Sequence, residues 1–314
     1  MIALSGAGWF LTDRLVAGGH WHDGGQPLRM VERNSLVMGS VISFSVIAGT
    51  EQDGYHAINE ALNVFHRIEK SCSMYRDDSE TSQIGRWSGR EAVSVSEDTL
   101  AILSKALEVY KQSEGYFDIT VNPALRRWGF RSDPDAPVIP PTDEERKRLE
   151  QVIGTQHLII EDGKVYLNKK GMSLDVGGIA GGYALDQAIA VMKKCSIAAA
   201  FINFSGDLHC FGRPASGTPW TARLYDPVTQ SVLSDPVELH DEALSTSGSY
   251  QNRRSDGHGH SWGHLFLPAE AEPVAPCASL TAIHPSAMTA DAWSTAEYVG
   301  AKSPGDVKVI RLKG

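Results

Sequence analysis

The chain has 314 residues, of which 42% are hydrophobic and 21% are charged, as in an ordinary soluble globular protein of one large or two modest domains. Its formal net charge of -9 argues against a nucleic-acid-binding protein, which normally presents a basic face. No stretch approaches the roughly 20 apolar residues that a membrane-spanning helix needs. The four cysteines (Cys72, Cys195, Cys210 and Cys277) are scattered without a CxxC pair, so neither a zinc site nor a disulfide framework is indicated.

The N-terminal segment, residues 1–35, is rich in glycine and predicts an irregular arm. It is a poor export signal because it lacks a basic start and carries Asp13 and Arg14. The location of the protein stays open: cytoplasmic if Met1 is the native start, periplasmic if an export signal has been trimmed. Residues 36–314 are predicted to form a single domain with two interleaved lobes.

The next part of the chain mixes helices and strands. Leu36–Ala48 is rich in β-branched residues and predicts a strand. Tyr55–Cys72 has helical periodicity, with one apolar face made by Ile58, Leu62, Phe65 and Ile68. The other elements expected up to residue 168 are a loop at Asp77–Ser82, a helix over Thr99–Ser113 capped by Ser96, a strand or extended turn at Phe117–Val121, a helix over Asp143–Ile153 capped by Thr142, and a hairpin over His157–Asn168 that turns at Asp162-Gly163.

Arg131–Thr142 contains four prolines and is the best candidate for a boundary between lobes. Beyond residue 168 the expected elements are helices over Tyr183–Cys195 and Ala290–Val299, strands at Ala198–Phe204, Trp220–Tyr225, Ser231–Leu239, Ala243–Ser245 and Leu280–His284, and a loop over His258–His264. Because helices and strands do not alternate strictly, the sequence favours an α+β fold over a doubly wound sheet.

Two distant segments suit one another chemically. Met172–Asp186 predicts a strand, a glycine-rich turn at Gly177–Gly182 (the glycine turn) and a helix start. Backbone amides exposed at such a turn attract phosphate. In Thr289–Gly300, Asp291 and Thr295 lie four residues apart, on one face of a helix. A carboxylate and a hydroxyl are hard oxygen ligands of the kind that Mg²⁺ takes. Together the segments predict a metal-assisted phosphate site.

Each motif also has a simpler interpretation. The glycine turn is not a dinucleotide fingerprint because Val176 breaks the spacing, and it can serve packing alone, with Asp175 capping it. Asp291 can be a helix N-cap or a surface residue. The histidines His258, His260 and His264 fit a transition-metal loop, a solvent-exposed loop, or a single general base.

In this order, the motifs of the chain resemble the ApbE family of FAD:protein FMN transferases from about Val37 to Gly300. The blocks that carry the resemblance are Met38-Gly39, Ser73-Met74-Tyr75 followed by Asp78-Ser79-Glu80, Gly115 to Val121 with Pro123 and Trp128-Gly129-Phe130, Asp175 to Asp186, Ile202 to Asp207, Ser245 to Tyr250, and Ala290 to Ala296. Each block is weak alone, and their order and spacing make the resemblance.

The resemblance implies an α+β fold related to the T-fold, with FAD in a central cleft between two lobes. It implies that Asp291, Thr295 and the carbonyl of Ala180 hold Mg²⁺ against the FAD pyrophosphate. The residues that it implies for the FAD site are Met38, Tyr75, Tyr116, Phe117, Asp118, Asp175, Gly178, Gly181, His264 and Leu265.

The implied reaction transfers FMN from FAD to a Thr or Ser hydroxyl and releases AMP, with His264 as the proton acceptor and Asp291 as the second candidate. The implied partner is an acceptor flavoprotein subunit of a redox or electron-transfer system. Some positions depart from the family pattern: Gly181 stands where Lys or sometimes Glu is usual, Leu267 where Asp is usual, and Ser205 where glycine is usual. These departures leave open a FAD pyrophosphatase or a FAD-binding protein with weak or lost transferase activity, and the histidine loop leaves open a metalloprotein without flavin chemistry.

Overall fold

The main body of the protein is an antiparallel sheet covered by helices. The computed structural model describes residues 21–23, 26–131, 133, 136–214, 218–249, 252–275 and 279–312. The eight strands of the sheet lie in the order β1-β2-β3-β7-β8-β13-β18-β19. Their bounds are β1 Trp21–Asp23, β2 Gln26–Val37, β3 Ser40–Ala48, β7 Ile197–Phe204, β8 Asp207–Phe211, β13 Ala243–Ser247, β18 Ser279–His284 and β19 Lys308–Leu312.

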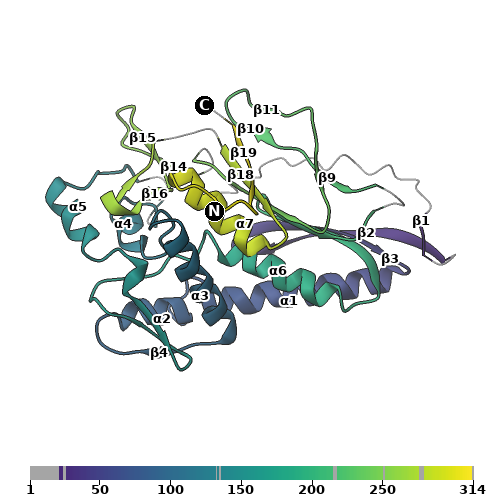
Figure 1. Ribbon diagram of the computed structural model, residues 1–314, viewed down its shortest axis with the longest axis horizontal. Coiled ribbons are helices and arrows are strands. Elements are labelled where there is room, and N and C mark those ends of the chain that lie inside the picture. The colour runs from purple at the N-terminus through teal and green to yellow at the C-terminus, as the bar shows by residue number, and fades with distance from the viewer. Residues whose placement is uncertain are drawn as a thin grey trace.

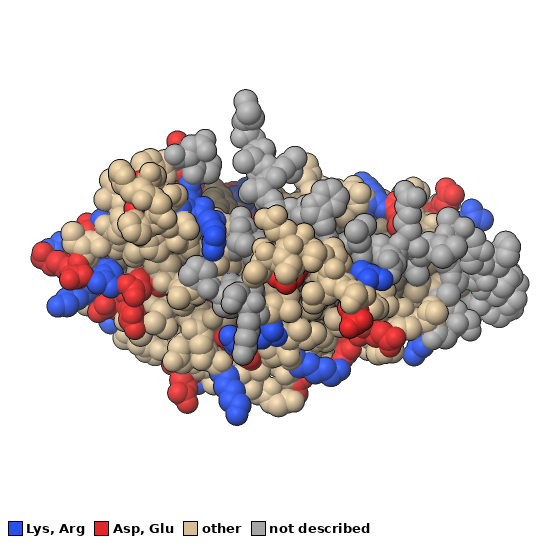
Figure 2. All heavy atoms as spheres, turned by 90° about the horizontal axis from the view of Figure 1, so that it is seen from above, with Lys and Arg blue, Asp and Glu red and all other residues tan. Residues whose placement is uncertain are grey.

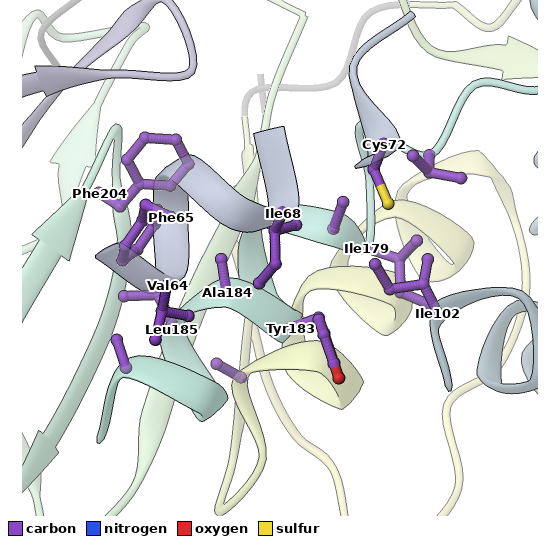
Figure 3. Close-up of a cluster of buried hydrophobic side chains, with 14 of the residues drawn as sticks. Val64, Phe65, Ile68, Cys72, Ile102, Ile179, Tyr183, Ala184, Leu185 and Phe204 are labelled. Carbon is purple, nitrogen blue, oxygen red and sulfur yellow. The ribbon is translucent and has the colours of Figure 1, made fainter. Parts of the chain in front are cut away.

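Helices α1 (Glu51–Cys72), α6 (Ala180–Met192) and α7 (Ala287–Val299) lie along one face of this sheet (Figure 1). The largest core forms where α1 and α6 meet each other and the sheet, and Figure 3 shows Phe65, Ile68 and Leu185 pointing into it. The rings of Phe65 and Phe204 lie 5.1 Å apart, which joins α1 to β7. Burial of these apolar side chains fixes the helices on the sheet.

The opposite face of the sheet is covered by short strands. They are β9 Trp220–Ala222, β10 Tyr225–Asp226, β11 Ser231–Val232 and β12 Val237–Leu239. The apolar side of this layer includes Phe201, Trp220 and Leu244. Each of the two strands predicted for this region is therefore divided into two shorter ones.

A second body packs at one end of the sheet, on the left in Figure 1. It contains α2 Glu80–Arg86, α3 Glu97–Gln112, α4 Asn122–Arg127, α5 Asp143–Glu150, the 3₁₀ helices Thr155–His157 and Pro268–Glu270, and strands β4 Val93–Ser94, β5 Leu158–Glu161, β6 Lys164–Leu167, β14 Arg253–Ser255, β15 Ser261–Gly263, β16 Phe266–Leu267 and β17 Glu272–Pro273. Trp128 packs against Phe266, and its Nε1 donates to the carbonyl of Ala271 at 3.0 Å. Segments far apart in the chain thus share one core, and the predicted α+β fold is confirmed.

Several local predictions are confirmed. The apolar face expected in α1 is buried at all of its predicted positions: Ile58, Leu62, Phe65 and Ile68. Thr142 and Glu145 form a capping box at the start of α5. The hairpin of β5 and β6 turns at Asp162 and Gly163, both with positive φ, as an Asp-Gly turn requires.

Other local predictions need correction. The expected irregular arm contains β1 and the first ten residues of β2, Gln26–Ser35, which pairs with β3. Met38 and Gly39 form the turn between these strands instead of a strand start. The expected loop at Asp77–Ser82 ends in the first turn of α2, and β15 interrupts the expected histidine loop. Of the two alternatives for Phe117–Val121, the structure has the turn and not the strand. Residues 1–20, Tyr250 and Cys277 lie outside the described residues.

The surface of the described residues carries charged side chains of both signs. Figure 2 shows acidic and basic side chains interspersed over the face seen from above. Among the described residues, no helix combines the length and apolarity needed to cross a membrane.

Helices α6 and α7 approach each other closely at Gly182. A Cβ placed on Gly182 would lie 2.3 Å from the carbonyl oxygen of Ala287 and 2.8 Å from Cβ of Asp291. Glycine is therefore required here by space and not by backbone conformation.

We expect Gly182→Ala to destabilise the protein by about 2 kcal/mol or more, although alanine normally favours a helix interior, because the added methyl group overlaps backbone atoms. Urea unfolding would measure the change. Gly49→Ala is the matched control, since a Cβ there meets nothing within 4 Å. Equal stability of the two variants would contradict the prediction.

Candidate functional site

The two segments that the sequence singled out lie against each other. The amide of Gly182 donates to Oδ2 of Asp291 at 3.0 Å. A Cβ on Gly178 would lie 3.0 Å from Oγ1 of Thr295, so the turn and α7 are in close contact here. A Cβ on Gly181 would lie 3.6 Å from both Oδ2 of Asp207 and Oδ2 of Asp291. The structure therefore brings the glycine turn, the predicted acid–hydroxyl couple and a further carboxylate into one place.

The start of α7 is held by a carboxylate of α6. Oδ1 of Asp186 accepts from the amide of Ala287 at 2.6 Å, and Oδ2 accepts from the hydroxyl of Ser286 at 2.7 Å. The buried His209 lies 3.2 Å from Oδ1 through its Nε2. Burial would raise the pKa of Asp186, but the hydrogen bonds from His209, Ser286 and the backbone outweigh it and lower this pKa. Ser286 is the N-cap of α7, so the interpretation of Asp291 as N-cap is wrong.

Around Asp291 lies an acid–hydroxyl cluster, made of Asp207, Ser245, Ser247, Asp291, Ser294 and Thr295. The hydroxyl of Ser245 donates to Oδ1 of Asp207 at 2.5 Å and lies 3.2 Å from Oγ of Ser294. Oγ of Ser247 lies 2.8 Å from Oγ of Ser294 and 3.3 Å from Oγ1 of Thr295. Ser294 in turn donates to the backbone carbonyl of Asp291 at 2.9 Å. A row of hydroxyls therefore runs from the carboxylate of Asp207 to the backbone carbonyl of Asp291.

The two carboxylates of the cluster are electrostatically strained. Burial raises the pKa of Asp207 to about 6, against the hydrogen bond from Ser245. Burial first, and then the charge of Asp207, raise the pKa of Asp291 well above its ordinary value. Two acids in one desolvated place favour a proton or a cation between them.

The donor set of the cluster fits Mg²⁺. Mg²⁺ takes carboxylate, hydroxyl and carbonyl oxygens and is usually held by one or two carboxylates together with substrate phosphates. Within the described ranges there is no group of three His, Cys, Asp or Glu side chains that could hold a metal without such help. Ala180, whose carbonyl is the third predicted ligand, is buried at the first position of α6, in the same turn as Gly178 and Gly181.

The predicted aromatic block lies beside the glycine turn. Phe117 is buried, and its ring edge is 3.6 Å from the place of a Cβ on Gly178. Tyr116 is partly exposed and packs over Gly300, at the end of α7. Asp118 points into the protein, where its two oxygens accept from the amides and hydroxyls of Thr120 and Thr155. Burial raises the pKa of Asp118 despite these bonds. Asp118 thus organises the turn that carries the aromatic rings.

A second group of predicted residues gathers around Arg131. The guanidinium pairs with the carboxylate of Asp175, and its Cζ lies 6.0 Å from the ring centre of Tyr75. The pKa of the His264 imidazole is lowered to about 4, first by burial and then by the nearby positive charge of Arg131. The negative charge of Asp175 acts in the opposite direction. His264 is therefore neutral at pH 7 and able to accept a proton.

The remaining predicted residues lie at the edges of these groups. Met38 is in the β2–β3 turn and packs partly against the main core, and Leu265 is buried with Leu280 in a smaller cluster. His258 and His260 are exposed on a loop whose amides are held by Asp256. Two surface hollows, one over β2, β3 and β7 and one over β5 and β6, contain none of the predicted site residues in their walls.

Sequence reasoning missed Asp207 and Arg131 as site residues. For Asp207 the sequence did offer a signal, because this acid directly follows a predicted buried strand and the turn Ser205-Gly206. In the structure, Ser205 has the positive φ that is usual for glycine. For Arg131 the sequence offered no signal, since it begins a proline-rich excursion that predicts surface.

Comparison with known proteins agrees with this geometry. The family model described as the ApbE family matches residues 38–306. The chain belongs to the ApbE family. The resemblance seen in the sequence is thereby confirmed, and the match includes the glycine turn, the acid–hydroxyl cluster and the residues around Arg131.

Relatives and solved structures give the same result. The chain is 28% identical over 284 residues to the FAD:protein FMN transferase of Vibrio cholerae, covering 89% of this chain and 84% of the relative. It is 30% identical over 248 residues to that of Salmonella typhimurium, covering 77% and 70%. The flavin transferase ApbE structure from Vibrio cholerae has a TM-score of 0.80 at 25% identity, covering 91% of this chain and 94% of the other. An ApbE protein from Thermotoga maritima has a TM-score of 0.78 at 27% identity, covering 86% and 87%. The ApbE-like α+β fold is confirmed.

We expect Asp207→Asn to stabilise the metal-free protein increasingly as the pH rises. Unfolded Asp207 ionises near 3.8, whereas the folded group keeps its proton to about 6, so its ionisation costs stability as the pH rises through this window. The variant should gain on the order of 3 kcal/mol between pH 3.5 and pH 8 relative to the parent. Urea unfolding with a chelator present measures it. Asp162→Asn, in an exposed turn, is the control and should show no such trend.

Proposed function

We propose that this protein is a FAD:protein FMN transferase that uses Mg²⁺, attaches FMN to a Thr or Ser hydroxyl of an acceptor protein and releases AMP. The observation that carries the proposal is the contact between the glycine turn and the acid–hydroxyl cluster, in which the amide of Gly182 donates to Asp291 and Gly178 lies against Thr295. The names of the relatives support flavin transfer. FAD enters as a substrate, and the partner is a flavoprotein subunit of a redox or electron-transfer system.

The side chains of Asp291 and Thr295 and the carbonyl of Ala180 would hold the metal ion. When bound, Mg²⁺ supplies positive charge that makes a phosphate a better leaving group. Asp291 also accepts from the amide of Gly182, which fixes its second oxygen. Because burial raises the pKa values of Asp291 and Asp207, a divalent cation would compete with protons for these two carboxylates.

His264 is suited to take the proton of the acceptor hydroxyl. In the transfer, the hydroxyl oxygen forms a bond to the FMN-side phosphorus, and the bond from this phosphorus to the oxygen that leaves with AMP breaks. The hydroxyl proton passes to His264, whose imidazole is neutral because burial and the charge of Arg131 lower its pKa. Tyr75, which is 77% exposed, offers an open ring face on which a planar part of FAD can stack.

Incubation of the protein with FAD, Mg²⁺ and a flavin-acceptor domain should give a fluorescent covalent adduct and one AMP for each FMN attached. Asp291→Ala should reduce the transfer rate by about a hundredfold or more, because it removes a ligand that fixes the metal. Asp235→Ala, at an exposed position, is the control. In the parent, but not in Asp291→Ala, addition of Mg²⁺ should raise the melting temperature.

Three other results would point to another function. AMP release without an adduct, over several acceptor domains, would make the protein a FAD pyrophosphatase in which water replaces the hydroxyl. FAD binding that does not depend on Mg²⁺, with no AMP release by the parent or by Asp291→Ala, would make it a flavin-binding protein. Bound zinc and indifference to FAD would favour the histidine-loop metalloprotein.

The pH dependence of transfer tests the role of His264. Because only the neutral imidazole accepts a proton, the rate should stay high as the pH falls below 6.5 and decline towards pH 4, where His264 becomes protonated. His264→Gln should lose most of the transfer rate at all pH values while it still binds FAD. At saturating Mg²⁺, where protonation of Asp207 and Asp291 no longer limits the rate, an acid limb near 6.5 in the parent would exclude His264 in its present surroundings as the base.

A further inference from the structure

Arg131 connects two residues predicted for the FAD site that come from separate segments. It follows α4, and its Nη2 donates to Oδ2 of Asp175, which lies just before the glycine turn. Its guanidinium also lies over the ring of Tyr75, from the loop after α1, at 6.0 Å. Its Nη1 donates to the carbonyl of Phe130 at 3.3 Å, which holds the guanidinium in place. One side chain thus spans three segments.

The ion pair is shielded from water, whereas the tyrosine ring is open. The side chain of Arg131 is 14% exposed and that of Asp175 is 7% exposed, but Tyr75 is 77% exposed. Removal of one partner of a buried pair leaves an uncompensated charge and is strongly destabilising locally. The position of Asp175 therefore depends on Arg131, while one face of Tyr75 stays available to a ligand.

A short chain of contacts leads from Arg131 to the acid–hydroxyl cluster. The other oxygen of Asp175, Oδ1, accepts from the amide of Gly177 at 2.9 Å. The next residue, Gly178, is the one that lies against Thr295. A displacement of the Asp175 carboxylate would therefore move the first residues of the glycine turn.

His264 faces the same ion pair. The charged groups that act on its imidazole are Arg131, from the segment after α4, and Asp175, from the segment before α6. Its Nδ1 is buried and has no hydrogen-bond partner among the described residues, and the same is true of Nε of Arg131. Two unsatisfied polar atoms of neighbouring side chains mark a place where a polar ligand would fit.

We propose that Arg131 is a positioning residue of the flavin site, which holds the Asp175 carboxylate, the Tyr75 ring and, through Asp175, the glycine turn in the arrangement that binds the dinucleotide. The proposal rests on the proposed function and deepens it. Arg131 has a second effect through its charge, which disfavours protonation of His264. Geometry and charge are separable, because lysine keeps the charge but lacks the planar fork that pairs with a carboxylate and stacks on a ring.

The test compares Arg131→Lys, Arg131→Gln and the double variant Arg131→Gln/Asp175→Asn, which leaves no unpaired charge if the single change impairs folding. Arg126→Gln, an exposed position on α4, is the matched control. Two quantities are measured without acceptor protein: the dissociation constant for FAD, from flavin fluorescence, and the titration of His264, from the NMR signals of its ring.

We expect Arg131→Lys and Arg131→Gln to weaken FAD binding by about tenfold, with no change in Arg126→Gln. The His264 midpoint should stay near 4 in Arg131→Lys and move up towards 6.5 in Arg131→Gln. The double variant should bind FAD as weakly as Arg131→Gln. Since fold loss alone would not separate lysine from glutamine, this pattern supports a positioning role.

Unchanged FAD affinity in both Arg131→Lys and Arg131→Gln would overturn the proposal, as would equal His264 midpoints in these two variants. FAD binding by the parent without FMN transfer would overturn only the proposed function, because both measurements are independent of turnover. A parent protein that does not bind FAD would overturn both.

Discussion

The contact between the backbones of α6 and α7 is the constraint on which the site depends. Gly182 leaves no side chain between the helices, so its amide reaches Oδ2 of Asp291 while the carbonyl of Ala287 passes close by. Asp186 fixes the start of α7 from the same helix, four residues further along. Because both bonds join the same two helices, Asp291 has little freedom to move relative to the glycine turn. The position of Asp291 relative to the glycine turn is thus fixed by helix packing and not by a loop.

The same arrangement places two acids where the protein alone does not neutralise them. Hydroxyls and amides satisfy part of their hydrogen-bonding capacity, but no basic side chain among the described residues pairs with Asp207 or Asp291 in the structure. The carboxylate of Asp175, in contrast, is paired with the guanidinium of Arg131. Asp207 and Asp291 therefore lack a cationic partner among the described residues, whereas Asp175 has one. Functional sites commonly carry such a cost in stability.

Much of the fold was accessible from the sequence because local patterns agree with the final packing. The apolar face of α1, the Thr142 capping box and the Asp162-Gly163 turn are local signals, and each keeps its meaning in the structure. The strand Gln26–Val37 was missed because its many polar residues give no regular alternation, and pairing with β3 decides its conformation. That Asp291 and Thr295 lie together was accessible because the two residues share a helix face. Arg131 was not, because its role arises from partners 44 and 56 positions away in the chain, at Asp175 and Tyr75.

The long sequence separation of the contact between Gly182 and Asp291, 109 residues, affects how the protein is made. During synthesis, the glycine turn leaves the ribosome well before α7, which occupies residues 287–299. Until then β13 lacks its neighbour β18, and the face of α6 that receives α7 is uncovered. Contacts between distant segments form slowly because the intervening chain must first be ordered. The contact between Gly182 and Asp291 therefore forms only after the stretch from α6 to α7 has been synthesised, and until then the side of α6 that receives α7 is open to other contacts.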